Sequence, residues 1–337
     1  MIEYKNTDLT ELDIKDKEHS VSEKRIMLQS FSDVGTQVIV LFILISVGAL
    51  LGRLGLITDA GSRTMTDIVL YAVTPCVIIN AFQREYQPRL LSGLLITLAA
   101  AVATMGFSVL LAELLYRKKD LSRDVVPKFA VVFSNCGFMA LPLQQAVLGE
   151  DGVFYGAVYV AVFNIFMWTY GLIAMSGKTQ LRQALKAVVN PGIIGTAVGL
   201  LLFVFSIRLP QVIATPISML AALNTPIPML IIGNQLIKSD LRRVLRDRDA
   251  YFAMAIRLIL LPLAVMGVLL LLKVDATVTA AVVIAVSSPV AAFTTMMSTK
   301  YGRDTGLSAG IVSASALFSL LTMPLIVGLT RYLAQSA

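Results

Sequence analysis

Two short runs of polar, glycine and proline residues interrupt apolar stretches of this sequence, and they are its main candidates for chemistry. Residues 134–142 read SNCGFMALP, and residues 287–289 read SSP. Residues of these types break a helix and leave main-chain amides without helical partners. The first amides of the helix after such a break carry a partial positive charge of about half a unit, so each run is a candidate anion site.

The side chains at these breaks can hydrogen-bond a carboxylate or offer oxygen to a small cation. We expect Asn135 to contact a substrate or coupling ion, with capping of the broken helix as its structural alternative. For the serines, a ligand role and a hydrogen bond to the preceding helical turn are about equally expected. The binding candidates are Ser134, Asn135, Gln145, Ser287 and Ser288, and the helix-break candidates are Gly137, Pro142 and Pro289.

Both prolines fit the start of the half-helix after a break, where a missing amide hydrogen costs nothing. Farther from the breaks, Asn164, Ser313 and Ser315 are as well suited to joining helices as to binding a ligand.

Residues for other chemistry are scarce. The chain has two cysteines, Cys76 and Cys136, in apolar stretches, and one histidine, His19, so neither a disulfide framework nor a His/Cys metal site is expected, and we predict no cofactor. The sequence has no HExxH motif, intramembrane aspartate pair or aspartate-rich diphosphate motif, which makes a membrane-embedded enzyme the weaker alternative. A channel would need a continuous polar stripe, so a sensor or channel is weaker too.

Composition indicates an integral membrane protein. The 337 residues are 57% hydrophobic and 15% charged, with a mean hydropathy of +0.79, which leaves too little polar surface for a soluble domain of this size. The net charge of +7 comes from residues spread over short loops, so no nucleic acid partner is expected.

After a hydrophilic tail at residues 1–30, which lacks the order of a signal peptide, we expect ten membrane-spanning segments. They are predicted at residues 31–52, 65–82, 90–115, 129–148, 154–175, 190–206, 212–237, 251–272, 277–298 and 306–330. No charged residue or histidine lies within the fourth, fifth, ninth and tenth segments, which carry or follow the two breaks. Asp67, Glu113 and Arg257 lie toward segment ends, where snorkelling or interfacial pairing is expected.

Loop charges predict the orientation. Loops after odd-numbered segments hold 17 basic residues, whereas loops after even-numbered segments and the C-terminus hold five. Because cytoplasmic loops are rich in Lys and Arg, we place the odd-numbered loops in the cytoplasm and both termini on the non-cytoplasmic side of the plasma membrane. The tail, with five basic and seven acidic residues, is outvoted by the loops.

The two breaks occupy matching positions in two halves of the chain. A shift of 153 positions pairs Ser134 with Ser287 and residues 149–151 (GED) with residues 302–304 (GRD). A shift of 151 superposes Thr74-Pro75 on Thr225-Pro226. We predict two five-helix repeats, at residues 31–176 and 190–337, joined by a short basic cytoplasmic loop at residues 177–189, with the second repeat inverted.

Four stretches of the sequence carry a family resemblance: residues 134–171 (SNCGFMALPLQQAVLGEDGVFYGAVYVAVFNIFMWTYG), Asn190-Pro191, residues 287–302 (SSPVAAFTTMMSTKYG) and residues 317–329 (LFSLLTMPLIVGL). They resemble the auxin efflux carrier family, and the short basic loop at residues 177–189 resembles that of its compact bacterial members. The resemblance covers about residues 35–332. It implies an all-α inverted-repeat fold like that of sodium/proton antiporters and bile-acid symporters, in which helices 4 and 9 cross where they unwind. It also implies a scaffold of helices 1, 2, 6 and 7, a moving transport domain of helices 3–5 and 8–10, and a homodimer through the scaffold.

We therefore expect a secondary transporter that moves a small organic anion, an auxin- or malate-like mono- or dicarboxylate, by an elevator-like motion. Efflux is favoured, because outward movement of one negative charge gains about 2.3 kcal/mol per 100 mV of inside-negative potential. No titratable group is expected at the midplane, so coupling by sodium and uncoupled uniport both stay open. The alternative within transport is a sodium-coupled organic-anion importer of the same fold.

Overall fold

The protein is described by a computed structural model that covers residues 31, 32, 34–116, 124–177 and 191–336. These residues are helical apart from turns, short connections and one isolated β-bridge. The predicted tail of residues 1–30 and the predicted basic loop of residues 177–189 lie outside the described residues, except for Gly177.

Seven helical stretches in the described part of the chain are long and apolar enough to cross a membrane. They are Val34–Arg53, Asp59–Ala81, Pro88–Leu115, Cys136–Ser176, Gln211–Leu236, Arg248–Leu271 and Thr305–Ala334. Two shorter apolar helices are Pro191–Val204 and Ala276–Ser287. A helix satisfies its own backbone hydrogen bonds, which a bilayer demands, so the prediction of an all-helical, multi-pass membrane protein is confirmed.

Several predicted segments consist of more than one helical piece. The first half of the chain contains α2 (Asp59–Ile68), η1 (Val69–Val73), α3 (Thr74–Ala81), α4 (Pro88–Leu115), α5 (Val125–Val132), η2 (Cys136–Ala140), α6 (Leu141–Phe166), η3 (Met167–Gly171) and α7 (Leu172–Ser176). The second half contains α9 (Pro191–Val204), α10 (Gln211–Ala222), α11 (Pro226–Leu236), α12 (Leu241–Arg246), α13 (Arg248–Ala255), η4 (Ile256–Leu260), α14 (Leu261–Leu271), α15 (Ala276–Ser287), α16 (Phe293–Lys300) and α17 (Thr305–Ser336).

Three of the short π-helical turns, η1, η2 and η4, each end two residues before a proline. Pro75, Pro142 and Pro262 each lie in the first turn of the α-helix that follows. Proline has no amide hydrogen and its ring clashes with the carbonyl four residues earlier, so the preceding turn widens instead of continuing as α-helix. These prolines therefore alter the helix locally, without ending it.

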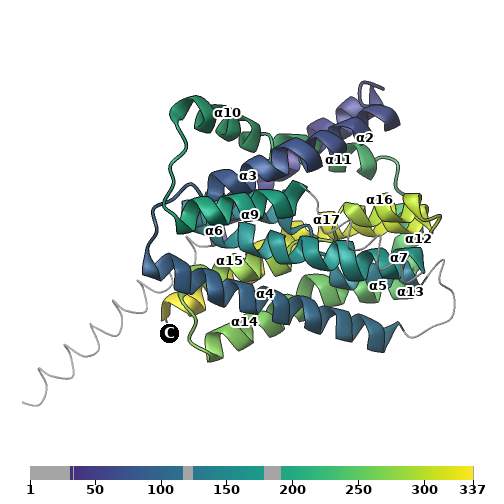
Figure 1. The fold of residues 1–337 in the computed structure, drawn as a ribbon. Helices are drawn as coiled ribbons and strands as arrows, with labels where there is room; N and C mark the ends of the chain where they lie inside the picture. Colours follow the sequence, from purple (N-terminus) through teal and green to yellow (C-terminus); the bar gives the residue numbers. More distant parts are fainter. Residues whose placement is uncertain (1–30, 33, 117–123, 178–190, 337) are drawn as a thin grey trace, which may run out of the picture.

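The helices pack as two groups. In the first group, the helix Val34–Arg53 lies so close to α11 that a β-carbon added at Gly48 or Gly233 would clash with backbone of the other helix. The same group contains α2, η1, α3, α9 and α10, since α3 packs on α9 and α10. The second group contains α4–α7 and α12–α17, in which α15 packs on both α6 and α17. Figure 1 shows α10, α2 and α11 on one side of the molecule and α4 and α14 on the opposite side.

Successive connections alternate between the two ends of the molecule. In Figure 1 the α3–α4, α9–α10 and α14–α15 connections lie at one end, and the α11–α12 and α16–α17 connections lie at the other. The connections after even-numbered segments therefore lie at one end, and those after odd-numbered segments lie at the other.

The two turns that the shift of 153 positions pairs each contain a glycine with a positive φ. Gly149, within α6, has φ 65° and ψ −148°, and Gly302, between α16 and α17, has φ 62°. Residues with a β-carbon rarely adopt such angles, which explains a glycine at both positions.

Candidate functional site

The two interrupted segments cross at their breaks. After α5 and α15 end, the chain runs as an antiparallel β-bridge between Ser134 and Val290. The amide of Asn135 donates to the carbonyl of Pro289 at 2.7 Å, and the amide of Ala291 donates to the carbonyl of Phe133 at 2.9 Å. The main-chain amides and carbonyls of each break therefore hydrogen-bond to those of the other. Unwound backbone inside a membrane needs such partners.

The local sequence explains why α15 stops where it does. Ser288 is extended, with φ −63° and ψ 147°, because the residue before a proline is pushed out of the helical region. Pro289 lies in the extended break, and α16 begins only at Phe293. The expectation that Pro289 stands at the start of a half-helix is therefore wrong, since it keeps the break extended and offers its carbonyl to Asn135. Pro142 is in the first turn of α6, after η2 has already begun the half-helix.

A small cavity borders the first turns of both half-helices. Its volume is about 10 Å³, room for a single water molecule. Phe138 of η2 lines it together with Ala292, Phe293 and Met296 at the start of the other half-helix. The remaining lining residues, from α2 and α11, are Thr66, Pro228, Ile231, Ile232 and Gln235. The first amides of a helix lack helical partners, so the cavity lies beside two positive helix ends and between the two helix groups.

The predicted serines differ in their bonding. The hydroxyls of Ser287 and Ser288 both donate to the carbonyl of Ile284, at 3.2 Å and 3.0 Å, which is the bond to the preceding turn. The hydroxyl of Ser134 is fully buried beside the thiol of Cys136, and it makes no bond to the preceding turn. Ser315 of α17 accepts from the amide of Val290 at 3.1 Å and so holds the second break in place.

Asn135 and Gln145 occupy different surroundings. Asn135 is buried, and its carbonyl accepts from the amide of Met139 at 3.0 Å, so its backbone takes part in both the bridge and the next helical turn. Gln145 is exposed. Its neighbour Gln144 is buried instead and donates from Nε2 to the carbonyl of Ala281 in α15 at 2.7 Å. The structure therefore brings Ser134, Asn135, Ser287, Ser288 and Pro289 together and leaves Gln145 apart.

Sequence reasoning missed Asn224, which lies at the interruption between α10 and α11. Its side chain donates from Nδ2 to the carbonyl of Gly137 at 3.0 Å, so it joins the first helix group to the break of the second. One signal was present: the shift of 151 positions aligns residues 224–226 (NTP) with residues 73–75 (VTP), next to the proline of the other half.

Sequence reasoning also misplaced Arg257. Glu113 pairs with Lys128 at 2.6 Å, as expected for a segment end, whereas Arg257 is only 1% exposed. It donates from Nη1 to the carbonyls of Val131 and Val132, at 3.1 Å and 3.2 Å, and from Nη2 to the carbonyl of Val286. The expectation of snorkelling is therefore wrong, and the crossed breaks do have a buried cation. Its position inside an apolar run was the available signal.

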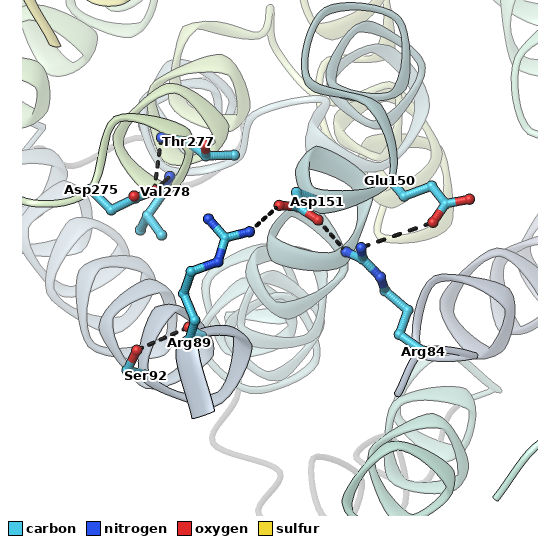
Figure 2. A network of polar contacts seen from close by, with 8 residues as sticks. All are labelled: Arg84, Arg89, Ser92, Glu150, Asp151, Asp275, Thr277 and Val278. Carbon is cyan, nitrogen blue, oxygen red and sulfur yellow. Dashed lines mark hydrogen bonds and ion pairs between the residues drawn. The ribbon is translucent and has the colours of Figure 1, made fainter. Parts of the chain in front are cut away.

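Charged side chains join the helix groups at one end of the molecule. Figure 2 shows Asp151 of α6 between the guanidinium groups of Arg84 and Arg89. Asp151 accepts from Arg84 at 2.5 Å and from Arg89 at 3.0 Å, and Glu150 lies 3.9 Å from Arg84. Arg84 follows α3 of the first group, whereas Arg89 opens α4 of the second, so Asp151 links the two groups.

Among the described residues, no group of three or more His, Cys, Asp or Glu side chains could hold a metal ion.

Comparison with known proteins relates the chain to membrane transporters. A family model described as "Membrane transport protein" matches residues 33–327. An uncharacterized transporter of Methanothermobacter thermautotrophicus is 23% identical over 293 residues, which cover 86% of this chain and 95% of the relative.

Proposed function

Because this chain belongs to the membrane transport protein family, the auxin efflux carrier family that its sequence resembles, we propose that it is a secondary transporter for a small organic anion. Membership makes it a multi-pass membrane transporter, and the residues give no support to an enzyme.

The proposal of an anionic substrate rests on the cavity beside the two half-helices. Phe138 and Phe293 line it from the first turns of the two half-helices, whose amides carry partial positive charge. A carboxylate is the common organic group that such amides recognise. Asn135, Ser134, Ser287 and Ser288 lie at the same breaks and are the further polar candidates, although none of the four lines the cavity while the helix groups are together. Gln145 is exposed and is the weakest of the proposed binding residues.

The apolar side chains of the cavity favour a substrate with a hydrocarbon or aromatic part. Ile231, Ile232 and Met296 offer no charged partner for a second carboxylate. Among the mono- and dicarboxylates that remain candidates, the lining therefore favours one carboxylate on an apolar body.

The fold that we propose has ten membrane crossings in two inverted five-helix repeats. It is supported by the crossing of two interrupted segments at Ser134 and Val290 and by the matching turns at Gly149 and Gly302. In this arrangement the first helix group is the scaffold (helices 1, 2, 6 and 7) and the second group is the transport domain (helices 3–5 and 8–10).

The size of the cavity supports alternating access. A volume of about 10 Å³ admits no carboxylate, so the two helix groups must separate before a substrate binds. We propose that the second group slides past the first as a unit, in an elevator-like motion, because the crossed breaks hold its helices together.

The orientation that we propose follows the loop charges, and the assembly follows the family resemblance. Both termini would lie on the non-cytoplasmic side of the plasma membrane. The inside-negative membrane potential would drive anions outward through an uncoupled carrier. We also propose a homodimer through the first helix group, since no side chain of α10 is fully buried and Val212 and Met219 are 86% and 68% exposed. A sodium-coupled importer is the alternative function.

The test is transport by purified protein in liposomes. A panel of mono- and dicarboxylates is offered with and without sodium, and currents are recorded across a set potential. We expect carboxylate-dependent currents that Asn135→Ala and Pro289→Ala reduce while both variants stay folded. If no member of the panel gives a current in either medium, the function is wrong, and a strict sodium requirement would favour the importer.

A further inference from the structure

Arg257 lies beneath the crossed breaks, on the π-helical turn η4. Its side chain is completely enclosed by protein, and none of the described acidic groups lies within salt-bridge distance of it. Its hydrogen-bond partners are three main-chain carbonyls: Val131, Val132 and Val286. A buried arginine needs compensation for its lost hydration, so these carbonyls have to supply it.

The three carbonyls belong to the last turns of two helices. Val131 and Val132 end α5, and Val286 is near the end of α15. The last carbonyls of a helix have no helical partner, and the helix dipole gives each end about half a negative charge. Two such ends amount to about one negative charge, which one guanidinium balances.

We propose that Arg257 is the resident counter-ion of the crossed breaks, a positioning residue that takes the place of a bound alkali cation and makes anion binding independent of sodium. Carbonyl oxygens at the ends of half-helices are the groups that would coordinate Na⁺ in an interrupted membrane helix. Here those of α5 and α15 already accept hydrogen bonds from Arg257. A sodium ion at these carbonyls would also meet the positive guanidinium at close range.

The consequence for the substrate rests on the proposed function. With the two negative helix ends balanced by Arg257, the two positive ends beside Phe138 and Phe293 stay uncompensated and sum to about one positive charge. A single carboxylate matches that charge, and a second carboxylate has no counterpart.

The side-chain type is informative as well. The planar guanidinium reaches two helices with three hydrogen bonds, whereas a lysine ammonium is a point charge on a flexible stem. Arg257→Lys should therefore keep the charge and lose part of the geometry, and Arg257→Met should remove both. Arg248→Met is the matched control, because it removes an exposed arginine from α13 in the same helical stretch.

The experiment measures melting temperature and carboxylate transport for the four proteins, in sodium and in N-methyl-D-glucamine media, with and without millimolar guanidinium. Wild type and Arg248→Met should give the same values in both cation media. Arg257→Met should melt at lower temperature and lose about tenfold or more of its transport, as removal of a buried charged partner does. Sodium or guanidinium should restore part of both, because either can occupy the vacated carbonyls. Arg257→Lys should fall between and show no cation dependence.

Two results would overturn the counter-ion role: wild-type transport or melting temperature that depends on sodium, or an Arg257→Met protein with wild-type behaviour in every medium. If Arg257→Met does not fold, the sodium titration of wild type and the comparison with Arg257→Lys still decide. If wild type carries no carboxylate at all, the proposed function fails, whereas the cation dependence of the Arg257→Met melting temperature continues to test Arg257.

Discussion

The main-chain amide of Asn135 donates a 2.7 Å hydrogen bond to the carbonyl oxygen of Pro289, which joins two chain segments that are distant in the sequence. Each residue belongs to a helix break that alone would leave polar backbone unpaired inside a membrane. The two breaks are therefore stable only as a pair, so the site they form requires both halves of the chain.

Asn135→Ala should reduce carboxylate transport about tenfold or more and leave the melting temperature within a few degrees of wild type. The bond to Pro289 uses the main chain and survives the substitution, so only the carboxamide is lost. Each removed hydrogen bond to a charged group costs about 1.5–3 kcal/mol. Transport assays in liposomes give the first quantity and thermal melting the second. Gln211→Ala is the control, because Gln211 is an exposed amide at the start of α10 and has no proposed role in binding; equal transport by both variants would contradict a ligand role for Asn135.

Asn224→Ala should lower stability by about 1 kcal/mol, because it removes the 3.0 Å hydrogen bond to the carbonyl of Gly137. Asn224→Asp should be more harmful to transport, since a carboxylate faces that carbonyl and repels an anionic substrate nearby. Measured apparent KM values should rise in the order wild type, Asn224→Ala, Asn224→Asp. A carrier indifferent to the aspartate would mean that no anion passes this point.

Gly233→Ala should destabilise the protein by about 1–3 kcal/mol, the usual cost of overpacking. Its new β-carbon would collide with the backbone at Ile45 and Ala49, which cannot move aside as a flexible side chain can. Gly106→Ala is the matched control in α4, where the added carbon meets nothing within 4 Å. It should be neutral or slightly stabilising, because alanine favours a helix. Melting temperatures in detergent compare the two, and equal values would show that the contact of α11 with the helix Val34–Arg53 is not close.

Asp151→Asn should weaken the link between the helix groups and shift the balance of closed and open states. Its carboxylate is within 2.5 Å of Arg84, and both side chains are 22% exposed, so the stability change should be about 1 kcal/mol or less. We expect a larger change in transport rate than in melting temperature, because the bond must break whenever the two groups separate.

Glu85→Gln is the control for this link, since its pair with Arg208 is well exposed at 77% and 56%. It should leave the transport rate unchanged. An effect of Asp151→Asn no larger than that of Glu85→Gln would contradict the role of Asp151, and raised ionic strength should shrink the difference between wild type and Asp151→Asn.

Much of the local structure follows from neighbouring residues. Apolar runs long enough to cross a bilayer form helices at the predicted places, since backbone amides and carbonyls in hydrocarbon must hydrogen-bond to one another. The residue before Pro289 becomes extended, and glycines occupy the left-handed turns at Gly149 and Gly302, for steric reasons that act within a few residues. Position along the chain was therefore enough to find both breaks.

What the sequence determined by itself is the membrane class, the family resemblance, the helices and the places where they break. Only the tertiary structure decided which groups meet at those breaks: Asn135 with Pro289, Asn224 with Gly137, and Arg257 with the ends of α5 and α15. Helix propensity and hydropathy are sums over near neighbours, whereas these contacts join distant segments. Arg257 shows the difference best, because its sequence position suggests a route to the membrane surface, and only the packing around it provides carbonyl partners in the interior.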